Sequence, residues 1–202
     1  MPSFAQLLRR IEEDLGQRHR YAHSVRVARC ADLLAQRHGA DPGKARLAGL
    51  LHDLARLYSP ERLVAECEAR NLPIDAAERR HPVLLHAKLG AAIAGERFGV
   101  HDAQVLSAIE KHTTAAGEMS PLDCSVYLAD SLEPHRSFPE RANLWRLAMD
   151  DLAAAMRGVL LLTMRHNARK GVATLPATLA AAANFGLTVA DGVPPEVRAS
   201  AS

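Results

Sequence analysis

Apolar residues along the chain recur at helical spacing, in segments bounded by residues that begin or end helices. The first segment follows Ser3 as its N-cap and ends at Gly16. Its apolar face consists of Phe4, Leu7, Leu8, Ile11 and Leu15. No stretch shows the sustained alternation of apolar and polar residues that is typical of strands. The pattern therefore predicts an all-α protein.

The same punctuation predicts the remaining helices. A capping Asp or Ser followed by proline, a preferred beginning of a helix, occurs at residues 41–42, 59–60 and 120–121. We expect further helices at residues 20–37, 42–55, 60–71, 84–98, 102–112, 121–132, 140–170 and 178–184. Because no linker or internal repeat divides the chain, we expect one domain over residues 1–187 and a flexible C-terminal tail over 188–202.

Composition supports this interpretation. The chain is 48% hydrophobic and 24% charged, as in ordinary globular proteins, and only 4% aromatic. Abundant alanine and leucine favour packed helices. A net charge of +2 does not point to a nucleic acid or a membrane as a partner.

Cysteine usage and apolar run length indicate the compartment. Three widely spaced cysteines are typical of reduced thiols rather than a disulfide framework. The N-terminus shows no secretory apolar region, and the longest purely apolar runs, residues 152–156 and 179–183, are far too short to span a bilayer. We therefore expect a cytoplasmic protein.

Six polar residues occupy segments that are otherwise apolar. They are His23, His52, Asp53, His86, His112 and Asp130. A lone histidine on an apolar face is more often a hydrogen-bonded core residue than a ligand, and Asp130 alone is equally well explained as a cap or ion-pair partner. Burying an unpartnered carboxylate is costly, whereas a shared metal ion makes the whole set favourable. Histidines in polar or turn-like surroundings are given no metal role: His19, His38, His81, His101, His135 and His166.

The order of these residues carries a resemblance. His23, the His52-Asp53 pair and Asp130 match the H…HD…D signature of HD-superfamily phosphohydrolases. Six strings further resemble the YqeK family of that superfamily: Arg-Tyr-Ala-His-Ser (20–24), Ala-Gly-Leu-Leu-His-Asp-Leu-Ala-Arg (48–56), Leu-Leu-His-Ala-Lys-Leu-Gly-Ala (84–91), Ala-Ile-Glu-Lys-His-Thr-Thr (108–114), Met-Ser-Pro-Leu (119–122) and Tyr-Leu-Ala-Asp-Ser-Leu-Glu-Pro-His-Arg (127–136). The His-Asp pair alone is a weak motif, whereas the ordered set is specific. The resemblance spans residues 4–184 and implies an HD-domain helical bundle.

Three positions depart from the family pattern. Ala87 stands where the family usually has glycine, and Arg56 replaces a lysine while keeping the charge. Two alanines, at residues 115–116, precede Gly117, where a glycine commonly follows the His-Thr-Thr string directly. The last change bears on nucleotide preference rather than on the metal ligands.

The resemblance implies an activity and a pair of metal ions. Members of the family are symmetrical bis(5′-nucleosyl)-tetraphosphatases, which split diadenosine tetraphosphate into two ADP molecules. The resemblance implies one metal on His23, His52, Asp53 and Asp130, and a second on His86 and His112, with Asp53 bridging both. It makes His52, Asp53 and Asp130 the expected catalytic residues, acting through a metal-activated hydroxide. Iron is the first expectation for the metal, with manganese or zinc as alternatives.

Residues within the matched strings are expected to meet the substrate. Candidates for the polyphosphate are Arg20, Arg56, Lys88 and Arg136, with hydroxyl donation from Thr113 and Thr114. Glu133 is a further candidate at the substrate site, as a partner that orients a ligand or an arginine. Surface solvation is the alternative interpretation for Arg56 and Lys88.

Other functions remain open from the sequence. A one-metal nucleotidase would not need His86 and His112, and other HD proteins hydrolyse guanosine tetraphosphate or cyclic dinucleotides, although no HD-GYP signature occurs here. A non-catalytic nucleotide-binding or ribosome-associated module would lack one or more ligands, and all six are present. The resemblance and the apolar C-terminal helices also favour a homodimer.

Overall fold

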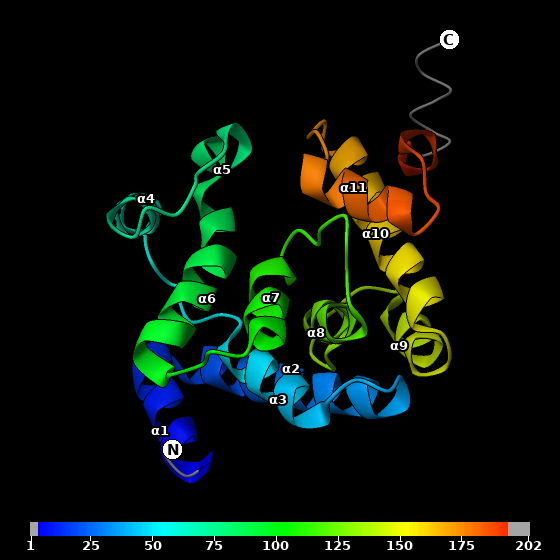
Figure 1. Ribbon diagram of the computed structural model, residues 1–202. Helices are drawn as coiled ribbons and strands as arrows, with labels where there is room; N and C mark the ends of the chain where they lie inside the picture. Colours follow the sequence, from blue (N-terminus) through cyan, green and yellow to red (C-terminus); the bar gives the residue numbers. More distant parts are fainter. Residues whose placement is uncertain (1–3, 194–202) are drawn as a thin grey trace.

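Helices and short 3-10 turns make up all the regular secondary structure in the part of the chain that the computed structural model describes, residues 4–193 (Figure 1). The helices are α1 (Phe4–Leu15), α2 (Arg18–Arg37), α3 (Pro42–Leu51), α4 (Pro60–Ala69), α5 (Ala76–Arg80), α6 (Leu85–Phe98), α7 (Ala103–Lys111), α8 (Pro121–Leu132), α9 (Arg141–Asp150), α10 (Leu152–Arg169) and α11 (Pro176–Asn184). The 3-10 turns are η1 (Pro82–Leu84) and η2 (Val189–Gly192). The all-α prediction is confirmed.

Side-chain caps explain where several helices begin. Asp41, Ser59, Asp102 and Ser120 each accept a hydrogen bond from a backbone N–H in the first turn that follows. These N–H groups have no partner within the helix, so the caps satisfy donors that would otherwise remain unpaired. The expected cap at Ser3 lies outside the described residues.

The helices form two groups, called flanks here, that lie on either side of a central set of helices. In Figure 1, α2 and α3 lie side by side, with α7 and α8 packed above them. Helices α4–α6 form one flank and α9–α11 form the other. One apolar cluster joins α2, α3, α4, α6, α7 and α8, and a second joins α8 to α9, α10 and α11. Helices α7 and α8 therefore lie where the two flanks meet.

A close approach between α2 and α3 depends on Gly49. A Cβ atom on this residue would lie 2.8 Å from the Cα atom of Ala28, well inside van der Waals contact. The absence of a side chain at this position lets the two backbones meet, and it sets the position of the residues that follow α3.

Two expectations about helix bounds are wrong, and one short helix was missed. The stretch 140–170 is two helices, because Asp151 adopts an extended conformation (φ −141°, ψ 103°) and caps α10 through the backbone N–H of Ala154. The third helix ends at Leu51 and continues as turns through Leu57 rather than extending to Ala55. Helix α5 was not expected; it begins with a capping box between Asp75 and Glu78.

The start of the expected tail forms a defined turn. Residues 189–192 make η2, which packs beside α10. Its capping box joins Thr188 and Asp191. The rest of the expected tail, residues 194–202, lies outside the described residues. None of the helices within residues 4–193 has the length and apolar character needed to cross a bilayer.

Candidate active site

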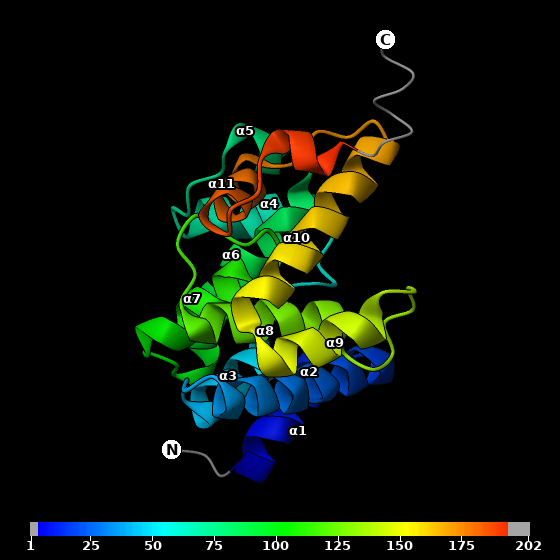
Figure 2. The same ribbon diagram turned by 90° about the vertical axis from the view of Figure 1, so that its right-hand side faces the viewer.

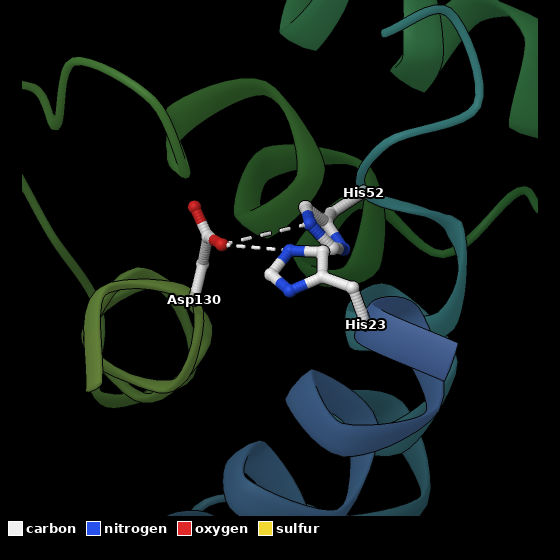
Figure 3. Close-up of side chains that lie close together, drawn as sticks. All are labelled: His23, His52 and Asp130. Carbon is white, nitrogen blue, oxygen red and sulfur yellow. Dashed lines mark ion pairs between the residues drawn. The ribbon is translucent and has the colours of Figure 1, made fainter. Parts of the chain in front are cut away.

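Five segments bring the six predicted ligands into one cluster. His23 lies on α2, His86 on α6, and Asp130 on α8, while His52 and Asp53 follow α3 and His112 follows α7. All are buried except Asp130, which is partly exposed. Figure 3 shows the side chains of His23 and His52 directed toward the Asp130 carboxylate. The Asp130 Oδ1 atom lies 3.0 Å from His23 Nε2 and 3.8 Å from His52 Nε2.

Backbone carbonyls orient three of the histidines in the same way. In each, the Nδ1 atom lies within hydrogen-bond distance of the carbonyl oxygen three residues earlier, and a carbonyl can only accept. The pairs are His52 with Gly49 (2.8 Å), His86 with Val83 (2.5 Å) and His112 with Ile109 (2.6 Å). The proton is therefore on Nδ1, and each Nε2 presents a lone pair to the cluster, as a metal ligand requires.

A buried carboxylate orients the fourth histidine. Glu133, which is 3% exposed, lies 3.2 Å from His23 Nδ1 and accepts a 2.6 Å hydrogen bond from Arg26 Nε. Burial alone would raise the pKa of Glu133, but the hydrogen bonds from Arg26, the backbone of His135 and His23 outweigh it and lower the pKa to about 2. Glu133 is therefore ionised, and its carboxylate orients His23 through the Nδ1 atom.

The donor set fits metal ions. The Nε2 atom of His52 is buried and has no hydrogen-bond partner among the described residues. The Nε2 atoms of His86 and His112 lie 3.2 Å apart, although each bears a lone pair. The ligand atoms of His23, His52 and Asp130 lie within 4.8 Å of one another, as do those of His52, Asp53 and His112. Metal ions bound between these atoms would coordinate the nitrogen lone pairs, which cannot form hydrogen bonds with one another.

Protonation equilibria also favour metal binding. Burial lowers the pKa of His112 to about 3 and also lowers the pKa of His86, so both are neutral near pH 7. Burial opposes ionisation of Asp53 and Asp130, yet both pKa values are lowered. For Asp130 the hydrogen bond from His23 is the first cause that outweighs burial, and for Asp53 it is the interaction with His52. For His23, burial is outweighed by the hydrogen bond and charge of Asp130, which raise its pKa. The site thus combines the neutral imidazoles of His86 and His112 with ionised carboxylates.

A cavity of about 320 Å³ opens over this cluster and contains several of the predicted substrate residues. Arg20, Arg56, Thr113 and Arg136 line it. The Nη1 atom of Arg20 lies 3.2 Å from Asp53 Oδ2, and Arg136 forms an ion pair with the carboxylate of Asp130. Cationic donors therefore stand at the rim of the ligand cluster.

Three predicted substrate residues lie elsewhere. Lys88 is two residues from His86, so it points to another side of α6. Its ammonium donates to the Pro73 carbonyl at 2.6 Å and pairs with Glu78 at 2.8 Å. Both Lys88 and Thr114 line a neighbouring cavity of about 340 Å³ rather than the one over the ligands. Glu133 does not line the ligand cavity either, but it contacts both His23 and Arg26, as expected for a partner that orients a ligand or an arginine.

The sequence interpretation missed other residues of this site. Tyr127, Ser131 and Thr163 line the ligand cavity, and burial raises the pKa of Tyr127 to about 12. Arg26, which holds Glu133, lies one helical turn after His23. That spacing on α2 was a usable signal for a partner of the site.

Comparisons with known proteins agree with the geometry. The HD domain family model matches residues 20–135. A symmetrical bis(5′-nucleosyl)-tetraphosphatase of Bacillus subtilis (strain 168) is 34% identical over 79% of this chain and 86% of the relative. A protein of the same name from Halalkalibacterium halodurans is 35% identical over 80% of this chain and 86% of the relative.

A solved structure shows the same fold. The crystal structure of a protein from Clostridium acetobutylicum, described as a predicted HD superfamily hydrolase involved in NAD metabolism, aligns with a TM-score of 0.87 and 32% identity. The alignment covers 92% of this chain and 97% of that one. The chain therefore belongs to the HD-domain family, in its YqeK branch, among relatives named symmetrical bis(5′-nucleosyl)-tetraphosphatases.

Proposed function

We propose that this protein is a metal-dependent hydrolase that cleaves diadenosine tetraphosphate symmetrically into two molecules of ADP. The observation that carries the proposal is the convergence of four imidazole Nε2 atoms and two carboxylates in one cluster beside a cavity bordered by arginines. The names of the relatives supply the substrate class.

The ligand arrangement supports two metal positions that share Asp53. His23, His52 and Asp130 would hold one ion together with Asp53, whose Oδ2 atom lies 3.6 Å from His52 Nε2. His86 and His112 would hold the other, on the side of Asp53 Oδ1, which lies 3.5 Å from His86 Nε2. Metal ions bound there would lower the pKa of water and offset charge on phosphoryl oxygens.

The cationic side chains have a direct role in substrate binding. Arg20 and Arg136 now neutralise Asp53 and Asp130, the carboxylates that a metal would neutralise instead. Once that charge is satisfied, both guanidinium groups are available to phosphate oxygens, where Arg56 also lies. Thr113 can donate its hydroxyl to the same phosphates from its position beside His86 and His112.

Symmetrical cleavage defines the bond that breaks. Water adds to one of the two inner phosphorus atoms, and the bridging oxygen between them leaves with the other half of the molecule. The new P–O bond completes one ADP, the leaving oxygen completes the second ADP, and the two protons of the water pass to the solvent near neutral pH. Arg20, Arg56 and Arg136 would offset the negative charge that develops on that oxygen.

Metal identity, assembly and compartment extend the proposal. The ligand set of nitrogen and oxygen without thiolate supports iron, with manganese or zinc as alternatives. Reduced cysteines, all three buried and unpaired, support a cytoplasmic location. Exposed apolar side chains in the C-terminal half, Leu147 on α9 and Val172 after α10, support a homodimer through this part of the chain.

A substrate panel tests the proposed activity. Purified protein loaded with iron or manganese is incubated with diadenosine tetraphosphate, AMP, guanosine tetraphosphate and a cyclic dinucleotide, and the products are separated by chromatography. We expect diadenosine tetraphosphate to be turned over with the highest kcat/KM. Preferential release of phosphate from AMP would instead identify a nucleotidase, and metal-loaded protein inert toward the whole panel would identify a binding module.

A further inference from the structure

A second, larger cavity adjoins the one over the metal ligands. Its volume is about 800 Å³, compared with about 320 Å³ for the ligand cavity. The two share four lining residues, Asp130, Ser131, Arg136 and Thr163. A molecule with a phosphate over the ligands can therefore extend into this larger space without leaving the protein surface.

Two segments build the larger cavity. One face of α10 contributes residues at positions 159, 162, 163, 166 and 169, whose spacing of three or four places them on a single stripe. The connection between α8 and α9 contributes Phe138, Pro139 and Glu140. In Figure 2 this connection and α10 lie on the same side of the molecule. The pyrrolidine ring of Pro139 restricts the backbone that presents Phe138.

The lining combines cationic and apolar side chains. Arg136 lies at the boundary with the ligand cavity, and Arg169 lies near the end of α10. The apolar part consists of the partly buried ring of Phe138 and the aliphatic side chains of Val159 and Leu162. Arginines suit phosphates, whereas an aromatic ring beside aliphatic side chains suits the flat face of a base.

The neighbouring cavity of about 340 Å³ is a poorer match for a nucleotide. Its carboxylates are Asp75, Glu78 and Glu110, against two lysines, and no aromatic side chain lines it. Both lysines already contact carboxylates, Lys88 that of Glu78 and Lys111 that of Asp123. Arg136 of the larger cavity is likewise paired, with Asp130, so the aromatic side chain is what distinguishes the larger cavity.

We propose that the larger cavity binds the nucleoside of one ADP half of the substrate, with its base against Phe138. This inference rests on the proposed function, since it assigns a location to one half of that substrate. The volume lies within the range of small-molecule sites, about 300–1,000 Å³.

Binding of ADP and photolabelling test the location. ADP affinity is measured by calorimetry for the metal-loaded wild type, for Phe138→Ala and for Leu175→Ala, the last a control in the neighbouring cavity. We expect Phe138→Ala to weaken ADP binding at least tenfold and Leu175→Ala to change it less than twofold. In the wild type, 8-azido-ADP is expected to label the tryptic peptide 158–165, which requires no variant to fold.

Four results of these experiments would contradict the proposed location of the nucleoside. Labelling of the peptide that begins at Gly171, weaker binding in Leu175→Ala alone, equal affinity in all three proteins, or no ADP binding by the wild type would each overturn it. The proposed function is judged separately by turnover. If the protein binds ADP through Phe138 but cleaves no dinucleotide, the subsite stands and the proposed activity is wrong. If the protein is active but is labelled elsewhere, the proposed activity stands and the subsite is wrong.

Discussion

His86 and His112 face each other through Nε2 atoms 3.2 Å apart, while the Nδ1 atom of each contacts a carbonyl of its own helical segment. Two imidazole lone pairs directed at each other repel unless a cation or proton lies between them. Burial lowers the pKa of both histidines, which disfavours the proton. This arrangement is the basis for the second metal position proposed above.

Replacing one member of this pair tests the second metal position. In His86→Ala, we expect bound metal to fall from about two ions per chain to about one, and kcat for diadenosine tetraphosphate to fall by a factor on the order of 100 or more. Metal content is measured by inductively coupled plasma mass spectrometry. His81→Ala serves as a control, because His81 lies outside the cluster. Full metal content with unchanged turnover would favour a one-metal nucleotidase.

Arg136 and Lys88 differ in what their positions predict for catalysis. Arg136 lines the ligand cavity, whereas Lys88 is paired with Glu78 outside it. We expect Arg136→Ala to lower kcat/KM for diadenosine tetraphosphate roughly 10- to 100-fold, because a bidentate phosphate contact is lost. Lys88→Ala should change kcat/KM less than threefold. Steady-state kinetics of the two variants decide the point, and a larger effect at Lys88 would contradict this assignment.

The low pKa of Glu133 predicts how acid affects stability. Its pKa is about 2 in the folded protein against an ordinary value of 4.5, so the ionised form stabilises the fold above pH 4.5. This contribution is lost as the pH falls from 4.5 toward 2. Between pH 6 and pH 3, metal-free wild type should lose about 2 kcal/mol more unfolding free energy than Glu133→Gln.

Urea denaturation at the two pH values measures this difference. Equal losses in both proteins would show that Glu133 is not responsible. The same variant should bind metal roughly 10- to 100-fold more weakly, because His23 loses the carboxylate that orients it.

Gly49 connects the helix packing to the site. In Gly49→Ala, the new methyl group would lie 2.8 Å from the Cα atom of Ala28, and we expect a loss of roughly 3 kcal/mol in stability. Metal affinity should also fall, since the carbonyl of Gly49 orients His52. Gly95→Ala is the matched control, because its Cβ would meet only ordinary contacts and alanine favours the helix. Thermal unfolding of both variants provides the comparison, and similar stabilities would contradict the packing argument.

Features encoded locally were predictable from the sequence. Caps such as Asp41 and Ser120 define helix starts through contacts within a few residues. The break at Asp151 was not predicted, because an aspartate within an apolar helical pattern looks like a solvent-facing helix residue. Its extended conformation is visible only in three dimensions.

The ligand residues were also predictable from the sequence, whereas the contacts around them were not. The order of the motifs led to six ligand candidates, and the structure brings all six together. The contact of Glu133 with His23 joins residues 110 apart in sequence, so periodicity carries no signal for it. Lys88 was expected at the substrate because it lies within a matched string, but the turn of α6 directs it toward Glu78.

Hydrolysis in oxygen-18 water tests the central claim most directly. Metal-loaded protein is incubated with diadenosine tetraphosphate, and the nucleotide products are analysed by mass spectrometry. We predict ADP as the sole nucleotide product, with one oxygen-18 atom on the β-phosphate of half of the ADP molecules. Formation of ATP and AMP, or no cleavage at all by protein containing its metal ions, would contradict the account.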